Sequence, residues 1–136
     1  MRQRIRDLFL LWFPLIGYLG AIFLLSAQRP NRLKPLPFPY FLHIVEYFIL
    51  AFLTFRALNG GLRRKIAVKS STLVVCFSLL YAISDEFHQS FVPGRDADPW
   101  DVLADFIGIA IGLMSIFAFQ RWIKKPPDKY PIKSEV

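Results

Sequence analysis

The sequence predicts an all-α membrane protein in which four transmembrane helices form a bundle. Hydrophobic residues make up 54% of the 136 residues, whereas charged residues make up only 20%. The apolar residues stand in four continuous blocks of about 18 residues each, close to the ~20 residues that a helix needs to cross a hydrocarbon core. Barrel strands would instead show an alternating pattern over ~10 residues. The bilayer is therefore the expected solvent.

The first block, at about residues 8–25, follows three arginines and resembles a signal peptide. Its length exceeds that of most signal h-regions, and the sequence "LLSAQ" is a poor cleavage context. We therefore expect a retained span. The other three spans are expected at about residues 41–58, 66–83 and 102–119.

The segments that connect the spans differ in character. The first, "SAQRPNRLKPLPFPY", contains four prolines, which fix φ and remove backbone donors, so we expect an extended surface connection. The second, "NGGLRRK", is a short basic turn. Residues 124–136 form a basic tail after the transmembrane domain, which we place at residues 1–123.

The distribution of basic residues predicts the orientation. The net charge is +7, but the basic residues flank the apolar blocks, which fits the positive-inside rule better than binding to nucleic acid. Twelve Lys and Arg residues fall on the side of the two termini and the "NGGLRRK" turn, against four on the opposite side. This predicts a multi-pass protein of the plasma (inner) membrane with both termini in the cytoplasm. Cys76 is the only cysteine, so no intramolecular disulfide can form.

Titratable residues gather near the outer ends of three predicted spans. His43 and Glu46 lie three residues apart at the start of the second span, and Asp101 and Asp105 lie one turn apart at the start of the fourth. A charged residue is costly within a span, by about 2.5–3.5 kcal/mol at its centre. We therefore expect Glu46 and Asp105, the deeper two, to face the interior of the bundle.

The third span ends in "YAISDEFHQ". If the helix continues through this stretch, Tyr81, Asp85 and His88 share one face and Gln89 lies beside Asp85. Glu86 belongs to the same polar end. Together the three spans predict an outward-facing polar pocket.

The segment "FVPGRDADPWD" predicts a turn followed by the start of a helix. Pro93 and Gly94 favour a tight turn, and Asp98 is a candidate N-cap with Pro99 at the first helical position. Arg95 either pairs with the nearby acids or presents a two-pronged donor to a phosphate or carboxylate.

The fourth span also carries a stripe of small residues. Gly108 and Gly112 continue the spacing of Asp101 and Asp105, so all four residues lie on one face. Glycines on such a face let a neighbouring helix approach closely, and the two acids then point into the same interface.

These residues allow three interpretations. The two histidines and the carboxylates would bind a divalent metal that activates water, although the spacing matches no metalloprotease motif. His88 and a neighbouring carboxylate would otherwise act as acid and base without a metal. The third interpretation is a hydrogen-bonded polar plug without a ligand. A channel or transporter is disfavoured, because the inner halves of the spans have almost no polar residues.

Residues 84–112, "SDEFHQSFVPGRDADPWDVLADFIGIAIG", resemble the signature of the VanZ-like family of small integral membrane proteins. The family shows an S-D-E-x-x-Q element, a P-G-R turn and a D-V-x-x-N-x-x-G helix, and "HIVEYFILAF" is similar to its other block. Two departures occur: Pro39 and Tyr40 replace the usual Asp-Lys before His43, and Asp105 replaces the usual Asn.

The resemblance implies a cell-envelope protein related to proteins of resistance to the glycopeptide teicoplanin. The family has no settled activity, so whether this protein is an enzyme stays open. We expect it to bind or modify a lipid-linked or cell-wall component, and a metal-dependent or acid–base hydrolase of an envelope lipid is the alternative. The candidate catalytic residues are Asp85, Glu86 and His88, and the candidate binding residues are His43, Glu46, Gln89, Arg95, Asp101 and Asp105.

Overall fold

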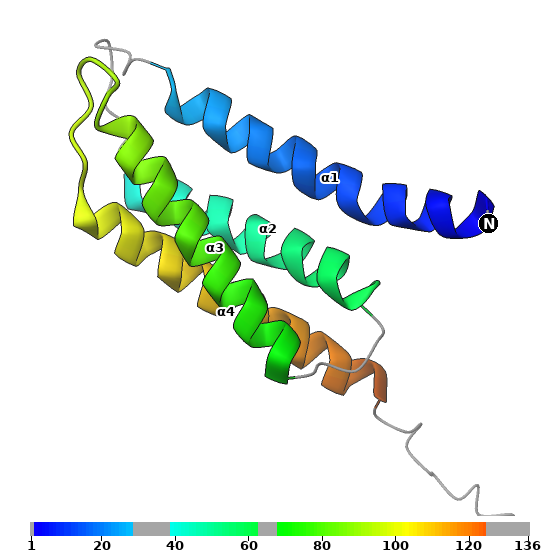
Figure 1. The fold of residues 1–136 in the computed structure, drawn as a ribbon. Helices are drawn as coiled ribbons and strands as arrows, with labels where there is room; N and C mark the ends of the chain where they lie inside the picture. The colour runs from blue at the N-terminus through cyan, green and yellow to red at the C-terminus, as the bar shows by residue number, and fades with distance from the viewer. Residues whose placement is uncertain (1, 29–38, 63–67, 125–136) are drawn as a thin grey trace, which may run out of the picture.

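The computed structural model describes residues 2–28, 39–62 and 68–124. These residues form four α-helices and contain no strand: α1 (Arg2–Ser26), α2 (Pro39–Asn59), α3 (Val68–Gln89) and α4 (Pro99–Lys124). All four helices are long and apolar enough to cross a membrane. The predicted four-helix architecture is confirmed (Figure 1). Residues 29–38 of the predicted first connection, residues 63–65 of the basic turn and residues 125–136 of the tail lie outside the described residues.

The ends of the helices differ from the predicted spans in a consistent way. Helix α3 continues to Gln89 instead of ending near residue 83. The polar side chains of its last turns make hydrogen bonds within the bundle, so this part of the chain is stable as a helix. Helices α2 and α4 both begin at a proline, Pro39 and Pro99. Proline suits the first position of a helix, because the backbone N–H there has no acceptor within the helix.

Successive helices run in opposite directions, so the start of α1 and the end of α4 lie at the same end of the bundle (Figure 1). Helices α2 and α3 both contact all the other helices, whereas α1 and α4 do not contact each other within the described residues. The last turns of α1 and α3 meet the first turns of α2 and α4 at the opposite end. We call this the polar end, because it contains the predicted site.

The core of the bundle is apolar, and so is much of its outer surface. Leu50, Phe55, Val74 and Ile109 are completely buried between α2, α3 and α4. Large hydrophobic side chains such as Ile16 are widely exposed along the outside of the helices. Such a surface is expected where lipid takes the place of water.

Helices α4 and α2 approach each other closely at the predicted glycine stripe. A Cβ atom on Gly108 would overlap the backbone carbonyl of Ile44, and one on Gly112 would lie 3.0 Å from the carbonyl oxygen of Phe48. Both contacts are with α2. The stripe therefore packs against α2, and Asp101 and Asp105, which lie above it on the same face, reach His43 on that helix.

Candidate functional site

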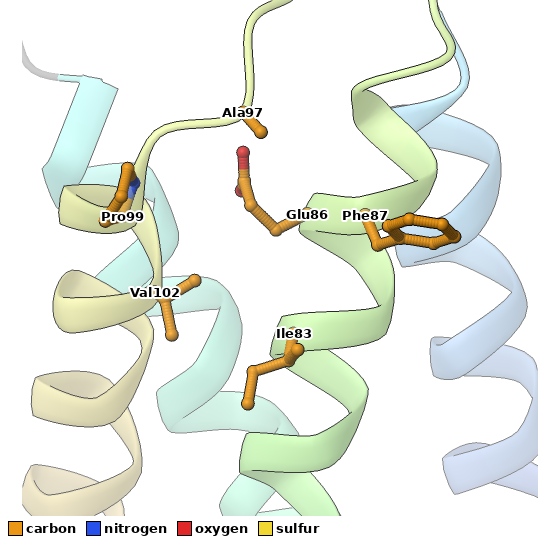
Figure 2. A pocket seen from close by; sticks show the side chains of 6 residues that line it. All are labelled: Ile83, Glu86, Phe87, Ala97, Pro99 and Val102. Atoms are coloured by element: carbon orange, nitrogen blue, oxygen red, sulfur yellow. The ribbon is translucent and has the colours of Figure 1, made fainter.

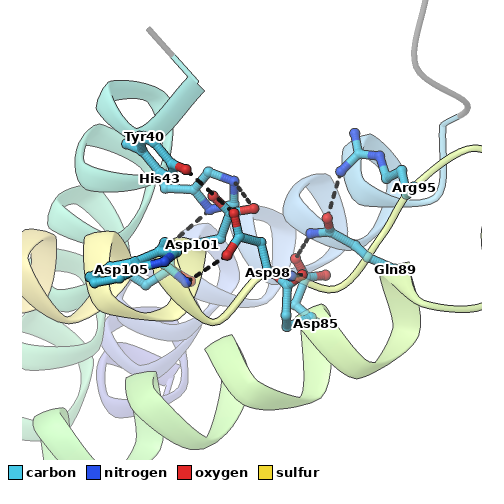
Figure 3. Close-up of polar contacts among 10 residues, drawn as sticks. Tyr40, His43, Asp85, Gln89, Arg95, Asp98, Asp101 and Asp105 are labelled. Carbon is cyan, nitrogen blue, oxygen red and sulfur yellow. Dashed lines mark hydrogen bonds and ion pairs between the residues drawn. The ribbon is translucent and has the colours of Figure 1, made fainter.

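His43 lies between two carboxylates that belong to successive turns of α4. Its Nδ1 atom lies 3.0 Å from Oδ1 of Asp105, and its Nε2 atom lies 3.7 Å from Oδ2 of Asp101 (Figure 3). Asp105 is only 2% exposed. The buried carboxylate fixes the imidazole ring, which is how an acid–base histidine is commonly oriented. We call these three residues the His43 cluster.

Hydrogen bonds of both the side chain and the backbone of Asp98 hold the segment before α4 in place. The side chain of Asp98 accepts the backbone N–H of Trp100 at 2.9 Å, which confirms the predicted N-cap. The backbone N–H of Asp98 donates to Oε1 of Glu86 at 2.9 Å, so α3 anchors this segment. The Tyr40 hydroxyl lies 3.4 Å from Oδ2 of Asp98 (Figure 3). These contacts join α2, α3 and α4 at the polar end.

A second cluster connects α1, α3 and the segment that follows α3. Asp85 accepts hydrogen bonds from the Ser26 hydroxyl at 2.6 Å and from Nε2 of Gln89 at 2.8 Å. The amide of Gln89 is thereby turned so that its Oε1 atom accepts a hydrogen bond from Arg95 at 2.7 Å (Figure 3). We call these four residues the Arg95 cluster. The predicted proximity of Gln89 and Asp85 is confirmed.

Arg95 makes no ion pair with a carboxylate of the described residues. Asp85, at 8% exposure, holds the amide of Gln89, at 4% exposure, and that neutral amide orients the guanidinium. Of the two roles that the sequence left open for Arg95, direct pairing with the acids is thus not observed.

Glu46 lies between the two clusters. It is partly buried, and its carboxylate is within electrostatic range of His43 and Asp105 of one cluster and of Asp85 and Arg95 of the other. The Tyr18 hydroxyl of α1 donates to the backbone carbonyl of Glu46 at 3.1 Å. Glu46 is therefore coupled electrostatically to members of both clusters.

Tyr81, Asp85 and His88 lie on one face of α3, as predicted, and that face packs against α1. The Tyr81 hydroxyl donates to the carbonyl of Leu19 at 2.6 Å. The His88 ring lies against the Phe23 ring with a centroid distance of 4.5 Å, and its Nδ1 atom is buried without a hydrogen-bond partner among the described residues. The structure thus brings Asp85 to Gln89 and Arg95, but it places His88 against an aromatic ring.

The described residues contain no group of three His, Cys, Asp or Glu side chains arranged to hold a metal ion. The geometry instead offers a histidine held by carboxylates and an arginine held by an amide. The first suits proton transfer, and the second suits the binding of an anion.

Sequence reasoning missed several buried polar groups. Ser26 was not identified as a partner of Asp85, since only the fold brings the end of α1 to α3. Deeper in the bundle, the hydroxyls of Tyr47, Thr54 and Ser78 are buried without a hydrogen-bond partner among the described residues. Buried groups of this kind are normally satisfied by water. Their single polar atoms produced no signal within long apolar runs.

Comparison with known proteins identifies the family of this chain. The family model described as VanZ/LLP1 matches residues 8–120, which include all four helices' central parts and both clusters. The chain belongs to the VanZ/LLP1 family. The predicted resemblance is therefore confirmed over most of the chain. No curated protein and no solved structure matches it significantly.

Membership of the VanZ/LLP1 family agrees with a multi-pass membrane protein whose helices lie in lipid. The residues quoted for the resemblance now have positions: the S-D-E-x-x-Q element supplies Asp85, Glu86 and Gln89 at the end of α3, and the P-G-R turn supplies Arg95. The Asp105 that replaces the usual Asn of the VanZ-like pattern is the carboxylate that holds His43.

Proposed function

We propose that this protein binds a phosphate-bearing, lipid-linked component of the cell envelope at its polar end, on the outer side of the plasma membrane. The orientation of Arg95 is the observation that supports this proposal most strongly. Its guanidinium is positioned by the buried Asp85–Gln89 pair, and no carboxylate of the described residues pairs with it.

A positioned guanidinium without a paired carboxylate is suited to an anionic ligand. Arginine presents several N–H donors in a rigid plane, which match the oxygen atoms of a phosphate in a bidentate contact. One donor of Arg95 is used by Gln89 at 2.7 Å. That contact holds the side chain in place before a ligand arrives, so less conformational entropy is lost on binding.

The location of the site supports a ligand that is anchored in lipid. The polar end lies at the ends of four helices that are long and apolar enough to cross a membrane. If they do so, this end would lie at the depth where headgroups meet the hydrocarbon core. The positive-inside rule predicts that this end lies outside the cytoplasm. A headgroup of the outer leaflet would reach Arg95 without leaving the membrane. We propose that a role in glycopeptide resistance, including teicoplanin resistance, would follow from binding such a cell-wall component.

A binding measurement with a lipid monophosphate tests this proposal. Phosphatidic acid in nanodiscs should bind the protein more tightly than diacylglycerol with the same chains, and Arg95→Gln should remove most of that preference. Gln89→Leu should weaken it as well, because the guanidinium loses its positioning partner. Lys69→Gln is the matched control, since Lys69 is exposed on α3, far from the polar end. Equal binding by Arg95→Gln and the unmodified protein would refute the proposal.

The orientation needs its own measurement. In a Cys76→Ser background, a cysteine introduced at Asp96, which is exposed beside Arg95, should react with a membrane-impermeant maleimide in intact cells. Labelling that requires permeabilised cells would place the polar end in the cytoplasm, and the proposal of an outer-leaflet ligand would fail.

The His43 cluster favours a second candidate function, acid–base hydrolysis of an envelope lipid. Asp105 binds Nδ1 of His43, while Nε2 faces the half-buried Asp101 at 3.7 Å. Neutral His43 would remove a proton from a water molecule held by Asp101 as the water oxygen attacks the phosphorus atom. The P–O bond to diacylglycerol would break, and the protonated His43 would return the proton to the leaving alkoxide. Release of inorganic phosphate from phosphatidic acid, lost in His43→Gln, would support catalysis. Binding without any release would limit the function to recognition.

A further inference from the structure

A groove lies between α3 and α4 at the polar end, on the outside of the bundle. It has a volume of about 350 Å³ and is lined by residues of both helices and of the segment between them: Ile83, Glu86, Phe87, Ala97, Pro99 and Val102 (Figure 2). Five of these six residues are apolar, and Glu86 supplies the carboxylate. Neither cluster described above includes this groove, and its apolar residues were not predicted to have a function.

The groove is open on the outer surface of the bundle, where two of its lining residues are exposed. Ile83 is 50% exposed and Phe87 is 66% exposed, and both belong to a helix that is apolar enough to span a membrane. Side chains with this exposure on such a helix face lipid. The groove is therefore accessible sideways from the hydrocarbon region, and an apolar chain fills it better than water does.

Glu86 is the charged residue that lines the groove. Its carboxylate points into the space between α3 and α4, toward Ala97 (Figure 2). Its Oε1 atom accepts the backbone N–H of Asp98, and its Oε2 atom accepts no hydrogen bond from the described residues. The residue as a whole is only 7% exposed. One oxygen atom of a largely desolvated carboxylate is thus available to a ligand in the groove.

The charges around Glu86 favour a cationic donor. Asp101 and Asp105 act on its carboxylate as like charges, and His43 acts on it with the opposite sign when the imidazole is protonated. An anionic group would be repelled at this position. An ammonium group would form a charge-assisted hydrogen bond with Glu86, and such bonds are about twice as strong as neutral ones.

We propose that the groove holds one acyl chain of an amine-headed membrane lipid, whose primary ammonium group donates to Glu86. The inference rests on the proposed function for the location of the ligand in the outer leaflet, and it adds the class of headgroup. Arg95 lies three residues before Asp98 in the same connecting segment. A headgroup that contains both an ammonium and a phosphate, as in phosphatidylethanolamine, would therefore present one charge to each residue.

Competition between two lipids tests the proposal directly. Phosphatidylethanolamine and phosphatidylcholine with the same acyl chains have the same net charge, but only the first has N–H donors. We expect the purified protein, in micelles with equal amounts of both, to retain phosphatidylethanolamine at least about fivefold better in native mass spectrometry. Glu86→Gln should remove this preference, because it keeps an oxygen for the Asp98 N–H but loses the charge.

The groove itself is tested by filling it. Ile83→Trp should lower the retention of both lipids several-fold, whereas Leu80→Trp should leave it unchanged, because Leu80 is 67% exposed on the same helix but does not line the groove. Thermal unfolding of each variant checks that it is folded. If the folded Glu86→Gln variant keeps the preference, or if both tryptophan variants behave alike, the proposal is wrong.

Arg95→Gln separates this inference from the proposed function. If Arg95→Gln binds phosphatidic acid as well as the unmodified protein does, the proposed function fails, whatever happens at Glu86. If it loses phosphatidic acid but keeps the preference for phosphatidylethanolamine, both proposals are supported as distinct contacts. Loss of the preference in the Arg95→Gln variant alone, with Glu86→Gln unaffected, would overturn the role given to Glu86.

Discussion

Replacing Gly108 with alanine tests whether the α2–α4 interface determines the geometry of the His43 cluster. The added Cβ would overlap the backbone carbonyl oxygen of Ile44, and a backbone atom cannot rotate away as a side chain can. Overpacking costs about 1–3 kcal/mol in protein cores, and we expect Gly108→Ala to fall near ~3 kcal/mol. Helix α4 must then move away from α2, which lengthens the distance between His43 and Asp105.

Three other glycines calibrate this value. At Gly112 the nearest atoms lie at 3.0 and 3.1 Å, so a small shift relieves the contact and we expect a cost of about 1 kcal/mol. A Cβ on Gly17 or Gly20 of α1 would meet nothing within 4 Å. Alanine there should be neutral or stabilising by roughly 0.5–1 kcal/mol, because glycine is a poor helix former.

The assay is unfolding of the purified protein in mixed micelles with increasing SDS, followed by circular dichroism at 222 nm (a standard helix signal). The free energy of unfolding should fall in the order Gly17→Ala, Gly112→Ala, Gly108→Ala. If Gly108→Ala unfolds at the same SDS fraction as Gly17→Ala, the close approach of α4 to α2 is wrong, and the position of His43 between Asp101 and Asp105 loses its basis.

Two further predictions concern the polar end. His43→Ala should lower the free energy of unfolding by about 3 kcal/mol, because the 2%-exposed Asp105 loses its partner. In a double-mutant cycle, Asp105→Asn in the same chain should restore part of that loss. Additive effects of the two mutations would contradict a direct contact. Asp98→Ala should lower the free energy of unfolding by about 1 kcal/mol in the same SDS titration, because it removes the N-cap of α4. Asp98→Asn keeps an acceptor for the Trp100 N–H and should lower it by less than half as much. Equal decreases for the two variants would argue against capping.

Much of the fold could be predicted because it depends on local features. The apolar blocks predict four helices, since only a helix satisfies its own backbone over that length in lipid. The start of α4 was predicted correctly from Asp98 and Pro99, because capping involves neighbouring residues only. The contact between Gln89 and Asp85 follows from one helical turn.

The candidate site was predicted less completely, because a face on one helix does not identify the helix that it meets. The stripe of Asp101, Asp105 and Gly108 was visible in the sequence, but its partner α2 was not. Similarly, the shared face of Asp85 and His88 was predicted, but the helix that it meets, α1, was not. Contacts between residues about sixty positions apart, such as Ser26 with Asp85 and His43 with Asp105, depend on how the helices pack.

The sequence by itself thus determined the number of helices, their class and the end at which their polar residues gather. These properties follow from the cost of placing charge and unsatisfied backbone in hydrocarbon, which each segment meets separately. Only the tertiary structure decided three further features: His43 is held by Asp105, Arg95 donates a hydrogen bond to Gln89, and Glu86 lines a groove between α3 and α4. Those arrangements arise from close packing between helices; for example, the fit of Gly108 against the backbone of Ile44 sets which side chains of α2 and α4 can meet.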